Sequence, residues 1–108
     1  AASGAADIVS IKISRVGGIR RALQMVAIAE AANMLYIIDE INEMRVCNTA
    51  VAHVAVATRS PLYTGTTCHL LLEDDPVLEG GVRVIDGRAV LDDVPGLGIS
   101  KIDLPIEL

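Results

Sequence analysis

The segment Asp7–Ile13 constrains the fold more than any other part of the sequence. Its residues alternate, so that Val9, Ile11 and Ile13 share one face while Lys12 lies on the other, as they would in a β-strand. A lysine ammonium is costly to bury unless it is paired or has chemical work to do. We therefore expect a strand whose apolar face packs against helices, with Lys12 either at the surface or acting as a catalytic base.

The rest of the chain alternates between helix and strand patterns until Pro61. A helix is predicted over residues 19–33, a strand in "MLYIID", and a second helix in "TAVAHVAVAT" that Asn48 or Thr49 would cap. Met25 and Ile28 lie off the main apolar stripe of the first helix, which indicates a second contact, with a neighbouring helix or a partner subunit. A third strand is predicted in "TTCHLLL". This order favours an α/β fold with parallel pairing and right-handed crossovers.

The C-terminal part has a different pattern. "EDDP" indicates a surface turn, and "VRVIDGRAVL" predicts a β-hairpin because Asp86-Gly87 separates two alternating runs and favours a tight turn.

Composition excludes several classes of partner. The net charge of −5 argues against nucleic acid, and no apolar run is long enough to span a membrane. Cys47 and Cys68 are too few for a disulfide framework, so we expect a reducing, cytoplasmic location. Together with the two histidines, these cysteines match no zinc spacing, and we expect no metal site in this chain.

The sequence resembles the C-terminal part of the enolase superfamily, in its muconate-lactonising enzyme and mandelate racemase branch. The resemblance is carried by "ADIVSIKISRVGGI", "AIAEAA", the "AVAH" helix and "DGRAVLDDVPGLGI", in this order. It implies that residues 1–72 form the last three βα units of a (β/α)8 barrel, a partial TIM-type barrel. Residues 73–108 would form a β-hairpin tail returning towards a capping domain that is absent.

The resemblance also implies a site. Lys12 matches the lysine that ends the sixth strand in that branch and serves as general acid/base next to the α-carbon of a carboxylate substrate. Glu43 lies where relatives often have a glutamate near the substrate, and Asp39 is the second candidate for substrate binding. The alternative for Asp39, Glu40 and Glu43 is a solvated acidic loop. "IIDEINEM" looks nearer to relatives that act on proline-type amino acids.

The chain departs from the family pattern in two further ways. Where many relatives carry a carboxylate on the eighth strand, this chain has Thr67, with His69 two residues on. The family binds Mg²⁺ through carboxylates on the third to fifth strands, which this sequence lacks, and the metal stabilises the charge formed by proton abstraction.

Two hypotheses follow, and whether the chain is an enzyme stays open between them. In the first, it is a truncated fragment without native catalysis, which is stabilised by self-association as a homo-oligomer. In the second, it is part of a Mg-dependent isomerase, racemase or lyase that abstracts the α-proton of a small carboxylate substrate, with Lys12 as acid/base.

Overall fold

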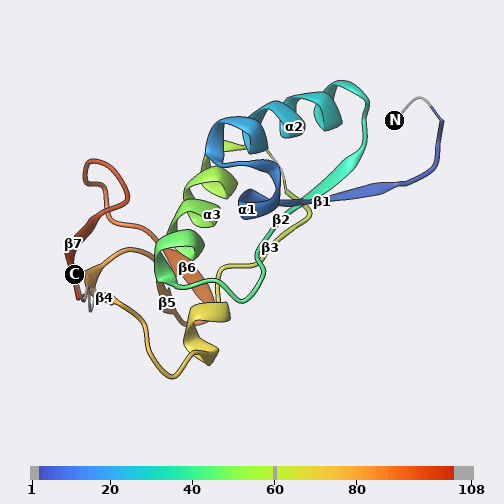
Figure 1. Ribbon diagram of the computed structural model, residues 1–108. Coiled ribbons are helices and arrows are strands. Elements are labelled where there is room, and N and C mark those ends of the chain that lie inside the picture. The colour runs from blue at the N-terminus through green and yellow to red at the C-terminus, as the bar shows by residue number, and fades with distance from the viewer. Residues whose placement is uncertain (1–2, 60, 104–108) are drawn as a thin grey trace.

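Three parallel strands form the central sheet of the computed structural model, which describes residues 3–59 and 61–103 (Figure 1). The strands β1 (Ile8–Lys12), β2 (Leu35–Asp39) and β3 (Tyr63–Thr64) lie side by side in the order β1-β2-β3. Both pairings are parallel. The predicted α/β arrangement is confirmed for this part of the chain.

Helices cover one face of the sheet. They are α1 (Ile13–Val16), α2 (Ile19–Ala31) and α3 (Arg45–Ala57). The chain turns from α1 into α2 at Gly17, which adopts φ 90° and donates its N–H to the carbonyl of Ile13. The strand is one residue shorter at each end than the predicted Asp7–Ile13, and at its carboxyl end the backbone enters a helical turn immediately after Lys12.

The aliphatic core lies between β1, β2 and the helices. Ile11, Ile38 and Val51 are completely buried and belong to one cluster. The cluster also contains Ile13, Ala22, Val26, Ala29, Tyr36, Ala50 and Val54. Burying an aliphatic side chain of this size contributes about 1.5–3 kcal/mol relative to leaving it in water. Ile11 therefore fixes which face of β1 meets the helices and which face carries Lys12.

The predicted cap of the second helix is wrong. Helix α3 begins at Arg45, so Asn48 and Thr49 lie inside it and are completely buried. The Arg45 N–H, which has no partner inside the helix, donates to Asp75 Oδ2 at 3.1 Å. This acceptor comes from a distant segment, and local sequence patterns cannot reveal it.

The predicted third strand is also wrong. The third strand is Tyr63–Thr64, and "CHLL" forms the 3₁₀ helix η1 (Cys68–Leu71). The N–H groups of Thr67 and Cys68 both donate to Glu40 Oε1 at 3.0 Å, which holds this segment in a turn. Within the described residues, β1 is followed by the short α1 and then α2, β2 is followed by α3, and β3 is followed by η1.

The predicted hairpin is confirmed in the C-terminal part. Strands β5 (Arg83–Ile85) and β6 (Arg88–Val90) pair antiparallel across Asp86 and Gly87, whose φ values of 49° and 74° are both positive, as a type I′ turn requires. Strands β4 (Val77–Gly80) and β7 (Ile99–Ile102) form a second antiparallel pair, which the sequence pattern did not predict.

The tail is attached to α3. Thr49 Oγ1 accepts the N–H of Val82 at 2.9 Å, and Val82 is itself buried. Among the described helices, none is long and apolar enough to cross a membrane.

Candidate functional site

The carboxyl ends of β1 and β2 bring Lys12 and Asp39 together. The two residues are register partners in the parallel ladder. Lys12 Nζ lies 2.5 Å from Asp39 Oδ2 and also donates to the carbonyl oxygen of Glu40 at 2.6 Å. Their side chains are 27% and 24% exposed, so the ion pair is partly withdrawn from water. Lys12 is therefore neither in the core nor extended into solvent, but held at the carboxyl edge of the sheet.

Asp39 accepts hydrogen bonds on both oxygens. Its Oδ1 accepts the N–H of Glu40 at 2.9 Å, and its Oδ2 accepts the Ser10 hydroxyl at 3.1 Å as well as Lys12. Burial raises the pKa of Asp39, but Lys12, the Glu40 N–H and Ser10 together outweigh burial and hold that pKa below its usual value. Asp39 is therefore a carboxylate throughout the neutral range.

Glu43 lies beside the segment that follows β1. Its Oε1 accepts the Ser14 hydroxyl at 2.7 Å, and its Oε2 accepts the N–H of Ile41. Lys12 and Ser14 are close in sequence, so the two candidate carboxylates contact one short stretch, Ser10–Ser14. The carboxylates of Asp39 and Glu43 therefore both accept hydrogen bonds from groups of the chain itself.

Glu40 is buried and does not belong to a solvated acidic loop, which was the alternative interpretation for this segment. It is only 8% exposed, and it is Oε1 that accepts the two N–H groups at the start of η1. Its Oε2 is buried without a hydrogen-bond partner. Gly65 faces the pair of acidic residues, because a Cβ there would lie 2.9 Å from Asp39 Oδ1 and 3.2 Å from Glu40 Cγ. Glu40 is thus a structural carboxylate that fastens η1 to the end of β2.

The two cysteines are free thiols near these carboxylates. The pKa of Cys68 is raised, first by its hydrogen bond to Glu40 and then by burial. The pKa of Cys47 is raised by burial and then by the negative charges of Glu43 and Glu40. Both thiols stay protonated near neutral pH, and protonated thiols are poor nucleophiles.

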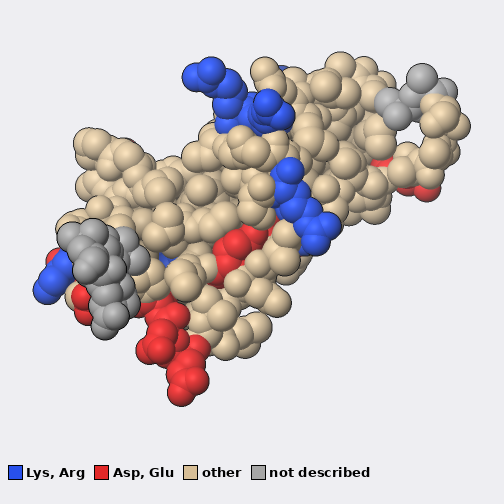
Figure 2. Space-filling model, in the orientation of Figure 1, with Lys and Arg blue, Asp and Glu red and all other residues tan. Residues whose placement is uncertain are grey.

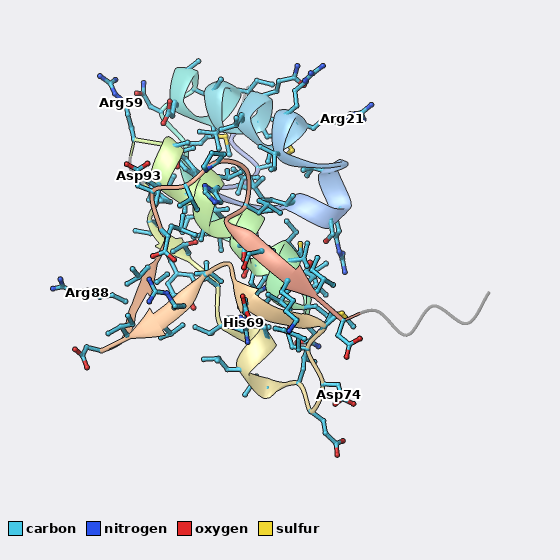
Figure 3. The ribbon with its side chains drawn as sticks, turned by 90° about the vertical axis from the view of Figure 1, so that its left-hand side faces the viewer. Arg21, Arg59, His69, Asp74, Arg88 and Asp93 are labelled. Atoms are coloured by element: carbon cyan, nitrogen blue, oxygen red, sulfur yellow. The ribbon has the colours of Figure 1, made fainter. Side chains whose placement is uncertain are left out.

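Neither Thr67 nor His69 supplies a carboxylate at the end of β3. The Thr67 N–H is bonded to Glu40, while the backbone N–H of His69 and its ring Nδ1 lie 3.0 and 2.7 Å from Asn48 Oδ1. Burial, followed by the positive charge of Arg45, lowers the pKa of His69. In Figure 3 His69 lies inside the molecule, whereas Arg59, Asp74 and Arg88 point away from it.

The residues present do not fit a magnesium site. Across residues 3–59 and 61–103, no group of three or more His, Cys, Asp or Glu side chains is arranged to hold a metal ion. The carboxylates nearest to Lys12 are already occupied by the ammonium, by serine hydroxyls and by backbone N–H groups. A metal ion at this edge would need ligands other than these residues.

Comparison with known proteins agrees with this arrangement of strands and helices. The enolase C-terminal domain-like family matches residues 1–103. The chain belongs to this family. Its relatives include an L-Ala-D/L-Glu epimerase from Clostridium acetobutylicum, which is 35% identical over 99 residues. A cis-3-hydroxy-L-proline dehydratase from Roseibium aggregatum is 31% identical over 101 residues.

The match covers a small part of each relative. It spans 92% of this chain but 27% of the epimerase, and 94% of this chain but 28% of the dehydratase. A dipeptide epimerase from Methylococcus capsulatus, solved in complex with a Mg ion, superposes with a TM-score of 0.85 and 32% identity, over 94% of this chain and 29% of the epimerase. That enzyme has also been solved with Mg and the dipeptide L-Arg-D-Lys.

Ser10 and Ser14 are the parts of the site that the sequence analysis did not single out. Each donates to one candidate carboxylate, Ser10 to Asp39 and Ser14 to Glu43. The sequence alternation places both serines on the same side as Lys12, but in the structure only Ser10 lies on β1, whereas Ser14 lies in α1. Their partners are Asp39, the last residue of β2, and Glu43 in the loop after it, and only the packing of the two strands identifies these pairs.

Proposed function

We propose that this chain contributes Lys12 as general acid/base to an isomerase, racemase or lyase site that moves a proton at the α-carbon of a small carboxylate substrate. The observation that carries the proposal is the Lys12 ammonium at the carboxyl edge of a parallel sheet, 2.5 Å from Asp39 Oδ2. Barrel enzymes keep their reactive groups at this edge. The epimerase and dehydratase relatives favour an amino-acid derivative, including a proline-type one, as substrate.

The chemistry assigned to the chain is limited to proton transfer and orientation. Lys12 exchanges a proton with the α-carbon, and Glu43 is the candidate for contact with the substrate. The negative charge that develops on the substrate carboxylate must also be stabilised. A divalent cation supplies such stabilisation when it is bound. Because the described residues do not form a site for one, we propose that any Mg²⁺ is held by other parts of the active protein.

The test is exchange of the α-hydrogen in D₂O, followed by proton NMR with Mg²⁺ present. The substrates are L-Ala-D-Glu, L-Ala-L-Glu and cis-3-hydroxy-L-proline. We expect Lys12→Met to reduce the exchange rate by about 10²–10⁴-fold, the usual contribution of a positioned acid or base. Lys101→Met is the matched control, since Lys101 lies on β7 and is exposed. Undiminished exchange in Lys12→Met overturns the proposal.

A second candidate is a chain without native catalysis that is stabilised by self-association. It is favoured by apolar side chains at the amino ends of the strands, since Ile8 and Leu35 are 46% and 53% exposed. An apolar pocket of about 220 Å³ lies next to them, lined by Val9, Met25, Ile28, Ala29 and Met34. Most of the face shown in Figure 2 likewise carries no charge.

The second candidate commits to another copy of this chain as the partner. Sedimentation equilibrium would then give a mass near twice the monomer value of 11.4 kDa. The change Ile28→Glu, on the pocket wall, would restore the monomer, whereas Arg20→Glu on the same helix would not. A monomeric wild-type chain at micromolar concentration contradicts this candidate. We also propose a reducing location, the cytoplasm, in keeping with the two free cysteines.

A further inference from the structure

We propose that Asp39, assisted by Ser10, is a positioning residue that holds the Lys12 side chain at the carboxyl edge of the sheet and fixes the direction of its ammonium group. This inference rests on the proposed function. It also replaces the sequence-based interpretation of Asp39 as a substrate-binding residue.

Two acceptors fix the position of the Lys12 ammonium. Asp39 Oδ2 lies 2.5 Å and the Glu40 carbonyl oxygen 2.6 Å from Lys12 Nζ. A lysine ammonium has three N–H groups and no acceptor. Two of them are directed at these oxygens, which leaves the third for a substrate atom. Both acceptors come from the end of β2, so they fix the direction of a side chain that would otherwise rotate freely.

Asp39 is itself held in place, which distinguishes it from a surface partner. Its two oxygens accept the N–H of Glu40 at 2.9 Å and the Ser10 hydroxyl at 3.1 Å. Gly65, which directly follows β3, packs against it, because a Cβ at that position would lie 2.9 Å from Asp39 Oδ1. A carboxylate with these contacts cannot turn towards a substrate without releasing Lys12. Its contribution to the reaction therefore passes through the lysine.

The ion pair with Asp39 holds Lys12 in place as an ammonium group. A carboxylate in contact stabilises the ammonium over the neutral amine, and the ammonium is the form that can give a proton. In that step a Lys12 N–H bond breaks, and the electron pair of the substrate carbanion forms the new C–H bond. The nitrogen keeps the pair of its broken bond, so the carbanion loses its negative charge and Lys12 becomes a neutral amine. The reverse step restores the ammonium.

The test uses the two lysines of the chain as probe and internal reference. An N-hydroxysuccinimide acetate ester reacts with neutral amines, and mass spectrometry of peptides gives the acetylation rates of Lys12 and Lys101 separately. We expect Asp39→Asn to raise the ratio of the Lys12 rate to the Lys101 rate about tenfold, the effect of losing one hydrogen bond between charged groups. Asp39→Glu should restore part of the protection.

Ser10→Ala and Ser14→Ala form a matched pair of control variants. Ser10 donates to Asp39 and Ser14 donates to Glu43, and both lie beside Lys12 in sequence. We expect Ser10→Ala to raise the ratio two- to threefold and Ser14→Ala to leave it unchanged. Far-ultraviolet circular dichroism shows whether each variant is folded. An unfolded Asp39→Asn leaves the decision to Ser10→Ala, and an unchanged ratio there overturns the inference.

This experiment separates failure of the inference from failure of the proposed function. Acetylation needs no substrate, so it reports on Asp39 even if no α-hydrogen exchange is found. If exchange is found, Asp39→Asn should lower its maximal rate while the substrate concentration at half-maximal rate stays unchanged, because a positioning residue does not contact the substrate. A raised substrate concentration at half-maximal rate with unchanged acetylation would assign Asp39 to the substrate instead, and would refute the inference.

Discussion

Replacing Asn48 by alanine should destabilise the attachment of η1 to α3. Asn48 is completely buried, and its Oδ1 accepts the His69 backbone N–H at 3.0 Å and lies 2.7 Å from the ring Nδ1. Because a carbonyl oxygen only accepts, the ring Nδ1 must carry a hydrogen. The substitution would leave both donors of His69 without an acceptor.

The size of the effect follows from counting unpaired groups. A buried donor that loses its partner costs about 1–3 kcal/mol, so two donors cost about 2–6 kcal/mol. Asn48 Nδ2 is itself buried without a hydrogen-bond partner, so removing it relieves a penalty of about 1–3 kcal/mol in the folded state. We therefore expect Asn48→Ala to lower the free energy of unfolding by about 2 kcal/mol.

Urea unfolding followed by circular dichroism measures this change, with the slope m unaltered if only stability has changed. Val56→Ala is the control on the same helix, because Val56 is 79% exposed and should change stability by less than about 0.5 kcal/mol. A double-mutant cycle with His69→Ala should give a coupling energy of about 1 kcal/mol. A loss in Asn48→Ala no larger than that in Val56→Ala would refute the reasoning.

Three further predictions concern charged groups. The pKa of His69 is lowered in the folded chain, so the unfolded chain binds more protons as the pH falls. The free energy of unfolding should therefore be highest above roughly pH 6.5 and fall below it. Urea titrations of wild type and His69→Ala should converge at low pH. Lys12→Met should raise the pKa of Asp39, measured by ¹³C NMR of the carboxyl carbon, and an unmoved midpoint would contradict the ion pair. Asp75→Ala removes the acceptor of the Arg45 and Val77 N–H groups and should lower the free energy of unfolding in urea by about 1–2 kcal/mol. The control Asp74→Ala, at an exposed residue, should change it by less than about 0.5 kcal/mol.

Elements whose determinants are local could be predicted from the sequence. The alternation before Lys12 gave the first strand and the face on which the lysine lies. Asp86-Gly87 gave the hairpin, because positive φ at two successive residues is a local requirement. The start of α3 and the 3₁₀ helix η1 could not be predicted in this way. They depend on Asp75 and Glu40, which lie far along the chain from the backbone groups they bind.

The candidate site divides in the same way. Lys12 drew attention as a lysine in an apolar strand, and the resemblance to the enolase superfamily implied its role and that of Glu43, whereas Asp39 was a candidate because of its place at the end of the second predicted strand. That Asp39 contacts Lys12 follows from the register of two strands, and register is set by packing across the sheet rather than by either strand alone. The role of Glu40 was missed because an acidic residue after a strand is usually solvated, whereas this one accepts two N–H groups from η1.

Lys12 is both the last residue of β1 and the residue that precedes the first turn of α1. Sliding β1 by one position against β2 would move the amine to the side covered by helices and bring Ile11, which is completely buried, out into water. The aliphatic core therefore penalises the same register error that would turn the Lys12 amine away from Asp39. Tight packing of the interior and the direction of the Lys12 side chain thus depend on one and the same strand register.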